Sequence, residues 1–87
     1  MKLVEIEWVD SSNAAGGTWH HKDDIDHGKN LSCRSVGWML HDQKEYIVIV
    51  AHQSFGNADG SLRQVGGDMT IPRCAITKIR VIRKAGK

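Results

Sequence analysis

Apolar and polar residues alternate along much of this chain, and the alternation predicts a β protein. The first apolar series, Val4, Ile6 and Trp8, is separated by more polar positions, which is the period-two pattern of a half-buried strand. Together with residues 2–9, four later segments have strand-like patterns: residues 33–42, 44–54, 68–71 and 75–82. We therefore expect five short strands in a single domain spanning residues 1–87.

The segments between the predicted strands differ in character. Residues 10–30 have almost no periodicity and several turn formers, so we expect a long excursion with one short helical turn at residues 21–26. Residues 55–67 are polar and glycine-rich, which predicts a mobile loop. The run YIVIVA within 44–54 is apolar on both sides and predicts a central, doubly covered strand. Residues 83–87 are expected to be a frayed basic tail.

Pro72 lies between the last two predicted strands. Its ring fixes φ and removes a backbone donor, so it suits a short 3₁₀ turn at a corner where the ladder is already broken. A corner at this place, after a long first connection, predicts a small closed barrel of five strands. The fold class is therefore all-β.

The segment IPRCAITKI resembles the end of an SH3-like domain, in which a strand runs into a proline, a 3₁₀ turn and a final strand. SVGWMLHDQKEYIVIVA and MTIPRCAITKIRVI resemble the second, third and closing strands of Sm-like barrels, with Gly37 permitting a bend. Neither the Sm-type asparagine pocket nor the aromatic groove of peptide-binding SH3 domains is evident. The resemblance implies the barrel and carries over neither activity.

The whole-chain layout EWVDS…GGTW…CRSVGWML…IVIVAHQS…IPRCAITKI also resembles small uncharacterised proteins of bacteriophages and prophages. This resemblance implies a phage accessory protein. Proteins of this kind include binders of host proteins or nucleotide signals that act against host defence.

Composition limits the function classes. The sequence has 87 residues and contains neither a signal-peptide pattern nor an apolar run as long as a membrane span. A cytoplasmic location is the expectation, with Cys33 and Cys74 as reduced, buried thiols, although one disulfide between them remains open.

Charge is distributed unevenly. Residues 1–43 carry a net charge of −3 and residues 44–87 a net charge of +5. This asymmetry suits an anionic partner, head-to-tail contact between subunits, or simply a solvated basic edge. Trp19 and Trp38 are candidate stacking platforms for single-stranded nucleic acid, but we assign Trp8 and Trp38 to the core.

Two kinds of chemistry are considered and not favoured. The segment WHHKDDIDHGKNLSC contains histidines, aspartates and a cysteine, but it lacks paired metal-ligand spacing, so we expect a solvated loop. No nucleophile lies in a motif such as G-x-S-x-G, so we expect neither an enzyme nor a cofactor.

The sequence thus predicts a non-enzymatic binding or assembly module, a homo-oligomer of phage type with an SH3/Sm-like barrel. The alternatives are an Sm-like protein that binds single-stranded RNA or DNA, and an anti-defence protein that binds a nucleotide or a host protein. The candidate ligand-binding residues are Trp19, His20, Arg34, Ser35, Arg73 and Lys78.

Overall fold

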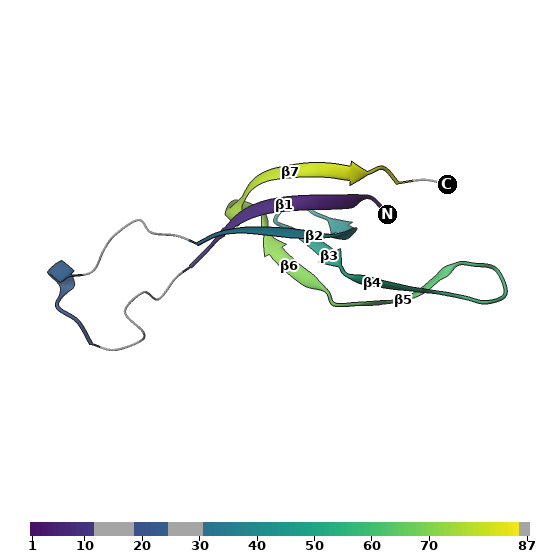
Figure 1. The fold of residues 1–87 in the computed structure, drawn as a ribbon, viewed down its shortest axis with the longest axis horizontal. Helices are drawn as coiled ribbons and strands as arrows, with labels where there is room; N and C mark the ends of the chain where they lie inside the picture. The colour runs from purple at the N-terminus through teal and green to yellow at the C-terminus, as the bar shows by residue number, and fades with distance from the viewer. Residues whose placement is uncertain (12–18, 25–30, 86–87) are drawn as a thin grey trace.

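The computed structural model describes residues 1–11, 19–24 and 31–85, and most of these lie in β-strands (Figure 1). The elements are β1 (Leu3–Asp10), η1 (Lys22–Asp24), β2 (Leu31–Asp42), β3 (Tyr46–Val50), β4 (His52–Phe55), β5 (Leu62–Gly66), β6 (Met69–Pro72), η2 (Arg73–Ala75) and β7 (Ile76–Arg83), where η denotes a 3₁₀ turn. The all-β prediction is confirmed.

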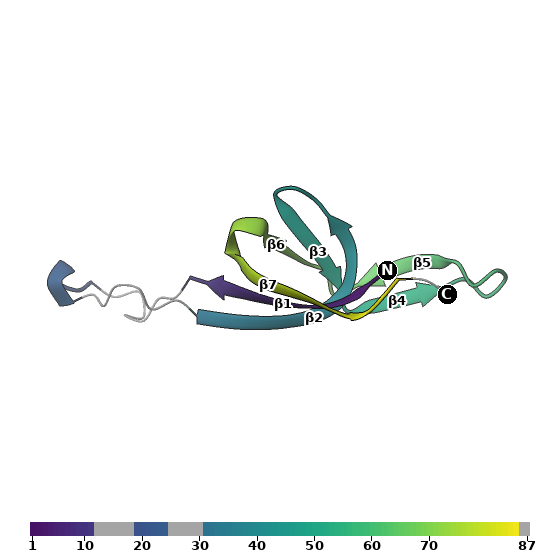
Figure 2. The same cartoon turned by 90° about the horizontal axis from the view of Figure 1, so that it is seen from above.

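Five strands form one antiparallel sheet in the order β6-β3-β2-β1-β7. Strand β2 is the longest and is shared between two ladders. Its first part pairs with β1 up to Trp38, and its last part pairs with β3 from Trp38 onward. Figure 2 shows β2 curving strongly, so that β3 and β6 are carried over one face of β1 and β7.

Gly37 lies in the bend of β2, where β2 and β3 approach each other closely. It is buried, and a Cβ at this position would lie 3.0 Å from both the Cβ of Ile49 and the carbonyl oxygen of Val50. A side chain at residue 37 would therefore separate β2 from β3. A register shift between Met39 and His41 completes the bend.

The hydrophobic core occupies the inside of this curve. Val4 and Ile6 of β1 meet Ile47 and Ile49 of β3 and Ile71 of β6, each at most 4% exposed. Partly buried side chains that pack against this cluster are Trp8, Met39, Ile76 and Ile79. We refer to the side of the sheet that carries these residues as the core face.

The prediction of a closed barrel is wrong. The ladders end at β6 on one side and at β7 on the other, and β6 pairs with β3 while β7 pairs with β1. The physical reason lies in η2, which turns the chain away from β6 after only four residues, the last of them a proline without a donor. The sheet is curled and open.

The corner at Pro72 itself is confirmed. β6 ends at Pro72, η2 covers Arg73–Ala75 and β7 begins at Ile76, with Pro72 at φ −60°. The amide of Ile76 donates to the carbonyl oxygen of Arg73, which closes the turn.

The prediction of a mobile loop over residues 55–67 is wrong, and residues 44–54 are not one strand. Residues 62–66 form β5, which pairs with β4 as a two-stranded hairpin. A break at Ala51 separates β3 from β4. The helical turn expected at 21–26 is a 3₁₀ turn at Lys22–Asp24, and its predicted end lies outside the described residues.

The molecule is elongated, with principal dimensions of 62 × 23 × 20 Å. The β4–β5 hairpin projects from one end of the sheet, and η1 lies beyond the opposite end in both views (Figures 1 and 2). Among the described residues, no helix has the length and apolar character needed to cross a membrane.

Candidate functional site

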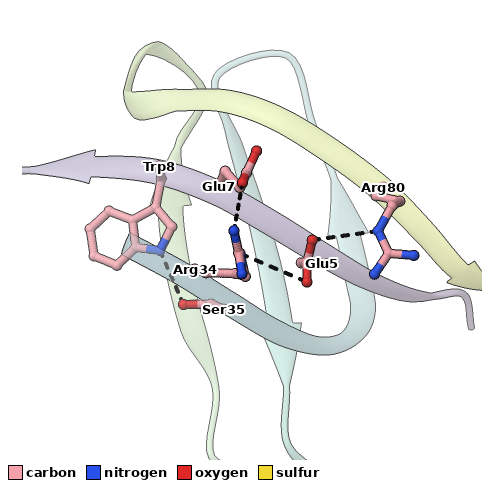
Figure 3. A network of polar contacts seen from close by, with 6 residues as sticks. All are labelled: Glu5, Glu7, Trp8, Arg34, Ser35 and Arg80. Atoms are coloured by element: carbon pink, nitrogen blue, oxygen red, sulfur yellow. Dashed lines mark hydrogen bonds and ion pairs between the residues drawn. The ribbon is translucent and has the colours of Figure 1, made fainter. Parts of the chain in front are cut away.

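The side of the sheet opposite the core face carries a row of alternating charges, shown in Figure 3. Arg34 of β2 lies between two glutamates of β1: its Nη2 is 3.1 Å from Glu7 Oε1 and its Nε is 3.9 Å from Glu5 Oε2. On the other side of β1, the Nε of Arg80 is 3.4 Å from Glu5 Oε1. We refer to this side as the charged face.

Lys78 belongs to the same row. It pairs with Glu7 across the β1–β7 ladder, while Arg34 pairs with Glu7 across the β1–β2 ladder. Directly opposed residues in antiparallel strands share a face. The structure therefore brings Arg34 and Lys78 together, one on each side of Glu7. Because the Arg34 side chain is 65% exposed, these pairs are well solvated and contribute little stability.

Ser35 follows Arg34 in β2 and therefore lies on the opposite face, the core face. Its hydroxyl accepts a hydrogen bond of 3.0 Å from the indole Nε1 of Trp8 (Figure 3). The same oxygen is 3.9 Å from the sulfur of Met69 in β6. Ser35 thus links three strands across the inside of the curl.

Beside Ser35 an open groove of about 250 Å³ runs toward the base of the hairpin. Its lining residues are Ser35, Val36, Ile49, Val50, Ala51, Gly67 and Met69. All except Ser35 are apolar or glycine. Such a surface accommodates an apolar group rather than a phosphate.

Arg73 lies in η2, where its side chain holds the β2–β3 turn. Its Nη2 forms an ion pair with Asp42 and donates to the carbonyl oxygen of Gln43 at 3.1 Å. Its backbone amide donates to the carbonyl oxygen of Glu45 at 2.8 Å. An open groove of about 530 Å³ here is lined by Lys44, Glu45, Arg73 and Cys74. The contacts of Arg73 give it a structural role in fixing the corner.

Trp19 and His20 lie in the described segment 19–24, at the end of the molecule opposite the hairpin. Trp19 is fully exposed. The six predicted ligand residues therefore do not form one pocket within a chain. Arg34 and Lys78 share the charged face, Ser35 lies on the core face, Arg73 lies at the corner, and Trp19 and His20 lie at the far end.

The tryptophans assigned to the core differ in position. Trp8 packs against the core cluster and is tied to Ser35. Trp38 is half-buried and lies opposite Leu3 and Val50 at the turn of β2. It lies on the charged side of β1, because Leu3 alternates with the core residue Val4.

Both thiols are free, with Cys33 partly buried and Cys74 exposed. The expectation that both are buried is therefore wrong for Cys74, which lies in the η2 corner. Among the described residues no group of three or more His, Cys, Asp or Glu side chains is arranged to hold a metal ion. Asp26 and His27 of the predicted candidate loop lie outside those residues.

A surface that the sequence interpretation missed lies on the β4–β5 hairpin. Gln53 pairs with Val65 and Phe55 pairs with Leu62, so these four side chains share one face. Phe55 is 54% exposed, Leu62 40% and Val65 39%. We call this the hairpin apolar face. Glycines and polar residues dominate the composition of residues 55–67 and predict a loop. Leu62 and Val65 are three residues apart rather than two or four, so the local pattern does not reveal the strand.

The tip of the hairpin is held by Asp59. Its Oδ1 accepts hydrogen bonds from the backbone amide of Ser61 at 2.9 Å and from the hydroxyl of Ser61 at 2.8 Å. These donors stabilise the carboxylate and lower the pKa of Asp59 below its ordinary value of 3.8. The amide of Gly56 donates to the carbonyl oxygen of Ser61 and closes the loop.

Comparisons with known proteins add no relative to this picture. No family model matches the chain, and neither the curated proteins nor the solved structures include a significant match. The resemblances to SH3-like, Sm-like and phage proteins therefore remain predictions from sequence motifs.

Proposed function

We propose that this chain is a non-enzymatic binding and assembly module that forms homo-oligomers. The observation that carries the proposal is the distribution of apolar side chains. Among the described residues, six hydrophobic residues are buried, whereas eleven large ones are exposed. Three of the exposed residues, Phe55, Leu62 and Val65, share the hairpin apolar face. A small domain has a marginal core, and exposed apolar side chains that lie together are typical of sites that contact other molecules. Burial of this surface in an assembly would add the stability that the core lacks.

An SH3-like arrangement is the finer part of the proposal. It is supported by the strand order β6-β3-β2-β1-β7, the long link from β1 to β2 and the 3₁₀ turn between β6 and β7. Two sheet edges, β6 and β7, are left for pairing with other chains. The phage origin rests on the sequence resemblance alone.

The test is the molar mass in solution. Light scattering and native mass spectrometry, from about 1 to about 100 µM, should show a mass above one chain that rises with concentration. A single-chain mass over that whole range would refute the homo-oligomer.

Binding of single-stranded nucleic acid is a second candidate, favoured by the basic side chains of β7. Lys78, Arg80 and Arg83 lie on this strand, Lys84 follows it, and no acidic residue occurs after Asp68. Against this, Arg80 is engaged by Glu5. A gel shift with single-stranded RNA at low salt should show binding that weakens steeply as salt rises. Absence of a shift at low salt would exclude the candidate.

A further inference from the structure

Strand β7 forms one edge of the five-stranded sheet. It is eight residues long and pairs with β1, and no other described strand pairs with it (Figure 1). The backbone amides and carbonyls that point outward from such an edge can pair with a further strand. The edge at the other end of the sheet, β6, is only four residues long and ends at Pro72, which has no donor. Of these two edges, β7 is therefore the better site for an added strand.

Basic side chains follow one face of this edge. Three residues of β7 lie opposite charged-face residues of β1 in the ladder, and these are Lys78, Arg80 and Arg83. The ion pair of Arg80 with Glu5, at 3.4 Å, confirms that this side chain points along the charged face (Figure 3). The edge thus presents positive charge at intervals along its length.

The acids of the charged face are already engaged. Glu5 and Glu7 both contact Arg34, and Glu5 also contacts Arg80. Among the described residues, neither Lys78 nor Arg83 forms an ion pair with an acid. The positive charge that is not balanced within the face therefore lies on β7, at the edge of the sheet. This charge is complementary to an acidic partner.

The core-face side of the same edge is apolar. Ile79 lies opposite the core residue Ile6. Val81 lies opposite the core residue Val4 and is 45% exposed. Ile82, the extra residue where the register shifts, is 43% exposed. Since side chains alternate between the faces of a strand, an added strand meets basic side chains on one face and apolar side chains on the other. Acidic and apolar residues in alternation complement both.

A second copy of this chain does not supply such a strand. Of the described strands, only β1 alternates glutamates with apolar residues, and β1 is already paired with β2 and β7 along its two edges. Pairing β7 with another β7 would place basic residues opposite basic residues, which is destabilising. The charges that prevent self-pairing of this edge therefore select a different chain.

Resting on the binding-module part of the proposed function, we infer that β7 accepts an extended segment of another protein as an added strand, and that acidic and apolar residues alternate in this segment. The edge favours a peptide over nucleic acid. A strand edge offers donors and acceptors in turn, which another peptide backbone matches, whereas phosphate oxygens only accept. The exposed side chains of Val81 and Ile82 likewise match apolar side chains of a peptide.

The first experiment measures binding of the fluorescein-labelled peptide VEVEVEVE by fluorescence anisotropy at pH 7, with protein from about 1 µM to about 1 mM. Two controls are VVVVEEEE, which has the same composition without alternation, and VKVKVKVK, which has the opposite charge. VEVEVEVE should bind at least about tenfold more tightly than VVVVEEEE, because only the alternating peptide presents one kind of side chain to each face. VKVKVKVK should not bind.

The second experiment changes the protein. Lys78→Glu/Arg83→Glu reverses the two unpaired charges of the edge and should weaken binding of VEVEVEVE at least about tenfold. Lys44→Glu/Arg63→Glu is the matched control, because it changes the net charge equally at residues outside β7, and it should leave the affinity within about twofold at about 0.15 M salt. Lys78→Gln/Arg83→Gln removes the charges without adding repulsion and should have a smaller effect. Circular dichroism establishes that the variants are folded.

The position of the peptide is tested by amide hydrogen exchange monitored by NMR. Saturating VEVEVEVE should slow the exchange of amides within residues 76–83, because outward amides of β7 become hydrogen-bonded. Amides of β6 should exchange as before. Protection of β6 in place of β7 would contradict the inference.

The outcomes separate this inference from the homo-oligomer. If VEVEVEVE and VVVVEEEE bind equally, or if the edge variant binds VEVEVEVE like the control variant, strand addition at β7 is wrong. If single-stranded RNA binds more tightly than VEVEVEVE and loses binding in the edge variant, the edge is a nucleic-acid site and the inference is wrong. An oligomer that does not bind VEVEVEVE refutes only the inference, and a single chain that binds it refutes only the homo-oligomer.

Discussion

The curled sheet and the β4–β5 hairpin are built from one sequence pattern with opposite outcomes. Both present apolar side chains on one face of an antiparallel ladder, and the pairing register is the same in the two ladders. In the sheet, Ile47 and Ile71 are at most 1% exposed because β1 lies across them, while on the hairpin Phe55 and Leu62 are 54% and 40% exposed. Alternation thus specifies which face is to be covered, and the path of the chain decides what covers it.

The comparison is most sharply tested by truncating one apolar side chain in each region. Ile47→Ala should lower the free energy of unfolding by about 2–5 kcal/mol, because it leaves a cavity in the core. Leu62→Ala should lower it by less than about 1 kcal/mol at a concentration where the chain is monomeric. Urea denaturation monitored by tryptophan fluorescence measures both. Equal losses would mean that the hairpin is as well packed as the sheet.

Glycine substitutions distinguish the regions next. In Gly37→Ala the new methyl group would lie 3.0 Å from the Ile49 side chain and from a backbone oxygen. We therefore expect the free energy of unfolding to fall by about 1–3 kcal/mol. In Gly66→Ala on the hairpin, the nearest atom is the Cβ of His52 at 3.7 Å, an ordinary contact. That variant should be neutral or slightly stabilising. The midpoint of thermal unfolding is the measurement, and a neutral Gly37→Ala would contradict the close approach of β2 and β3.

Ser35→Ala removes the acceptor for the partly buried indole N–H of Trp8. We expect a loss of about 1–2 kcal/mol, because the donor is left without a protein partner. Ser54→Ala, on the exposed hairpin, is the matched control and should change stability by less than about 0.5 kcal/mol. Chemical denaturation measures the free energy of unfolding of both variants. Equal values for Ser35→Ala and Ser54→Ala would contradict a stabilising hydrogen bond between Trp8 of β1 and Ser35 of β2.

On the charged face, Arg34→Gln should lower the free energy of unfolding by only about 0.2–1 kcal/mol at low salt, because the ion pairs of Arg34 with Glu5 and Glu7 are solvated. The loss should shrink as salt is raised toward about 1 M, because the attraction is screened. Arg63→Gln on the hairpin, with no ion pair in the described contacts, should show no such salt dependence in the monomer. A loss for Arg34→Gln that is independent of salt would point to packing by its side-chain stem instead.

The smallest effect concerns the pH response of the hairpin tip. Hydrogen bonds from Ser61 lower the pKa of Asp59 in the folded chain. They therefore stabilise the fold fully at pH values above 3.8, the ordinary pKa of an aspartate. This contribution to stability is lost as the pH falls through the lowered pKa of Asp59 in the folded chain. NMR should show the Ser61 amide shifting with a midpoint below 3.8, and Asp59→Asn should abolish this step. A midpoint at or above 3.8 would contradict the hydrogen bonds.

The sequence predicted some features of this region correctly and others wrongly. Pro72 and the run after it predicted the 3₁₀ corner correctly, because a fixed φ and a missing donor act locally. Barrel closure was predicted wrongly, since it depends on whether β6 and β7 meet, and no local property of either strand decides that. The sequence prediction groups Arg34 and Ser35 as ligand residues, but adjacent residues in a strand point to opposite faces.

The sequence by itself determined that the chain forms strands, where its corner falls and which side chains alternate toward a core. These are consequences of backbone restriction and period-two patterning within a few residues. Only the tertiary structure decided that the sheet stays open, that Arg34 and Lys78 flank Glu7, and that the hairpin apolar face is left uncovered. Those features depend on which distant strands pair, and pairing is selected by the free energy of the whole fold.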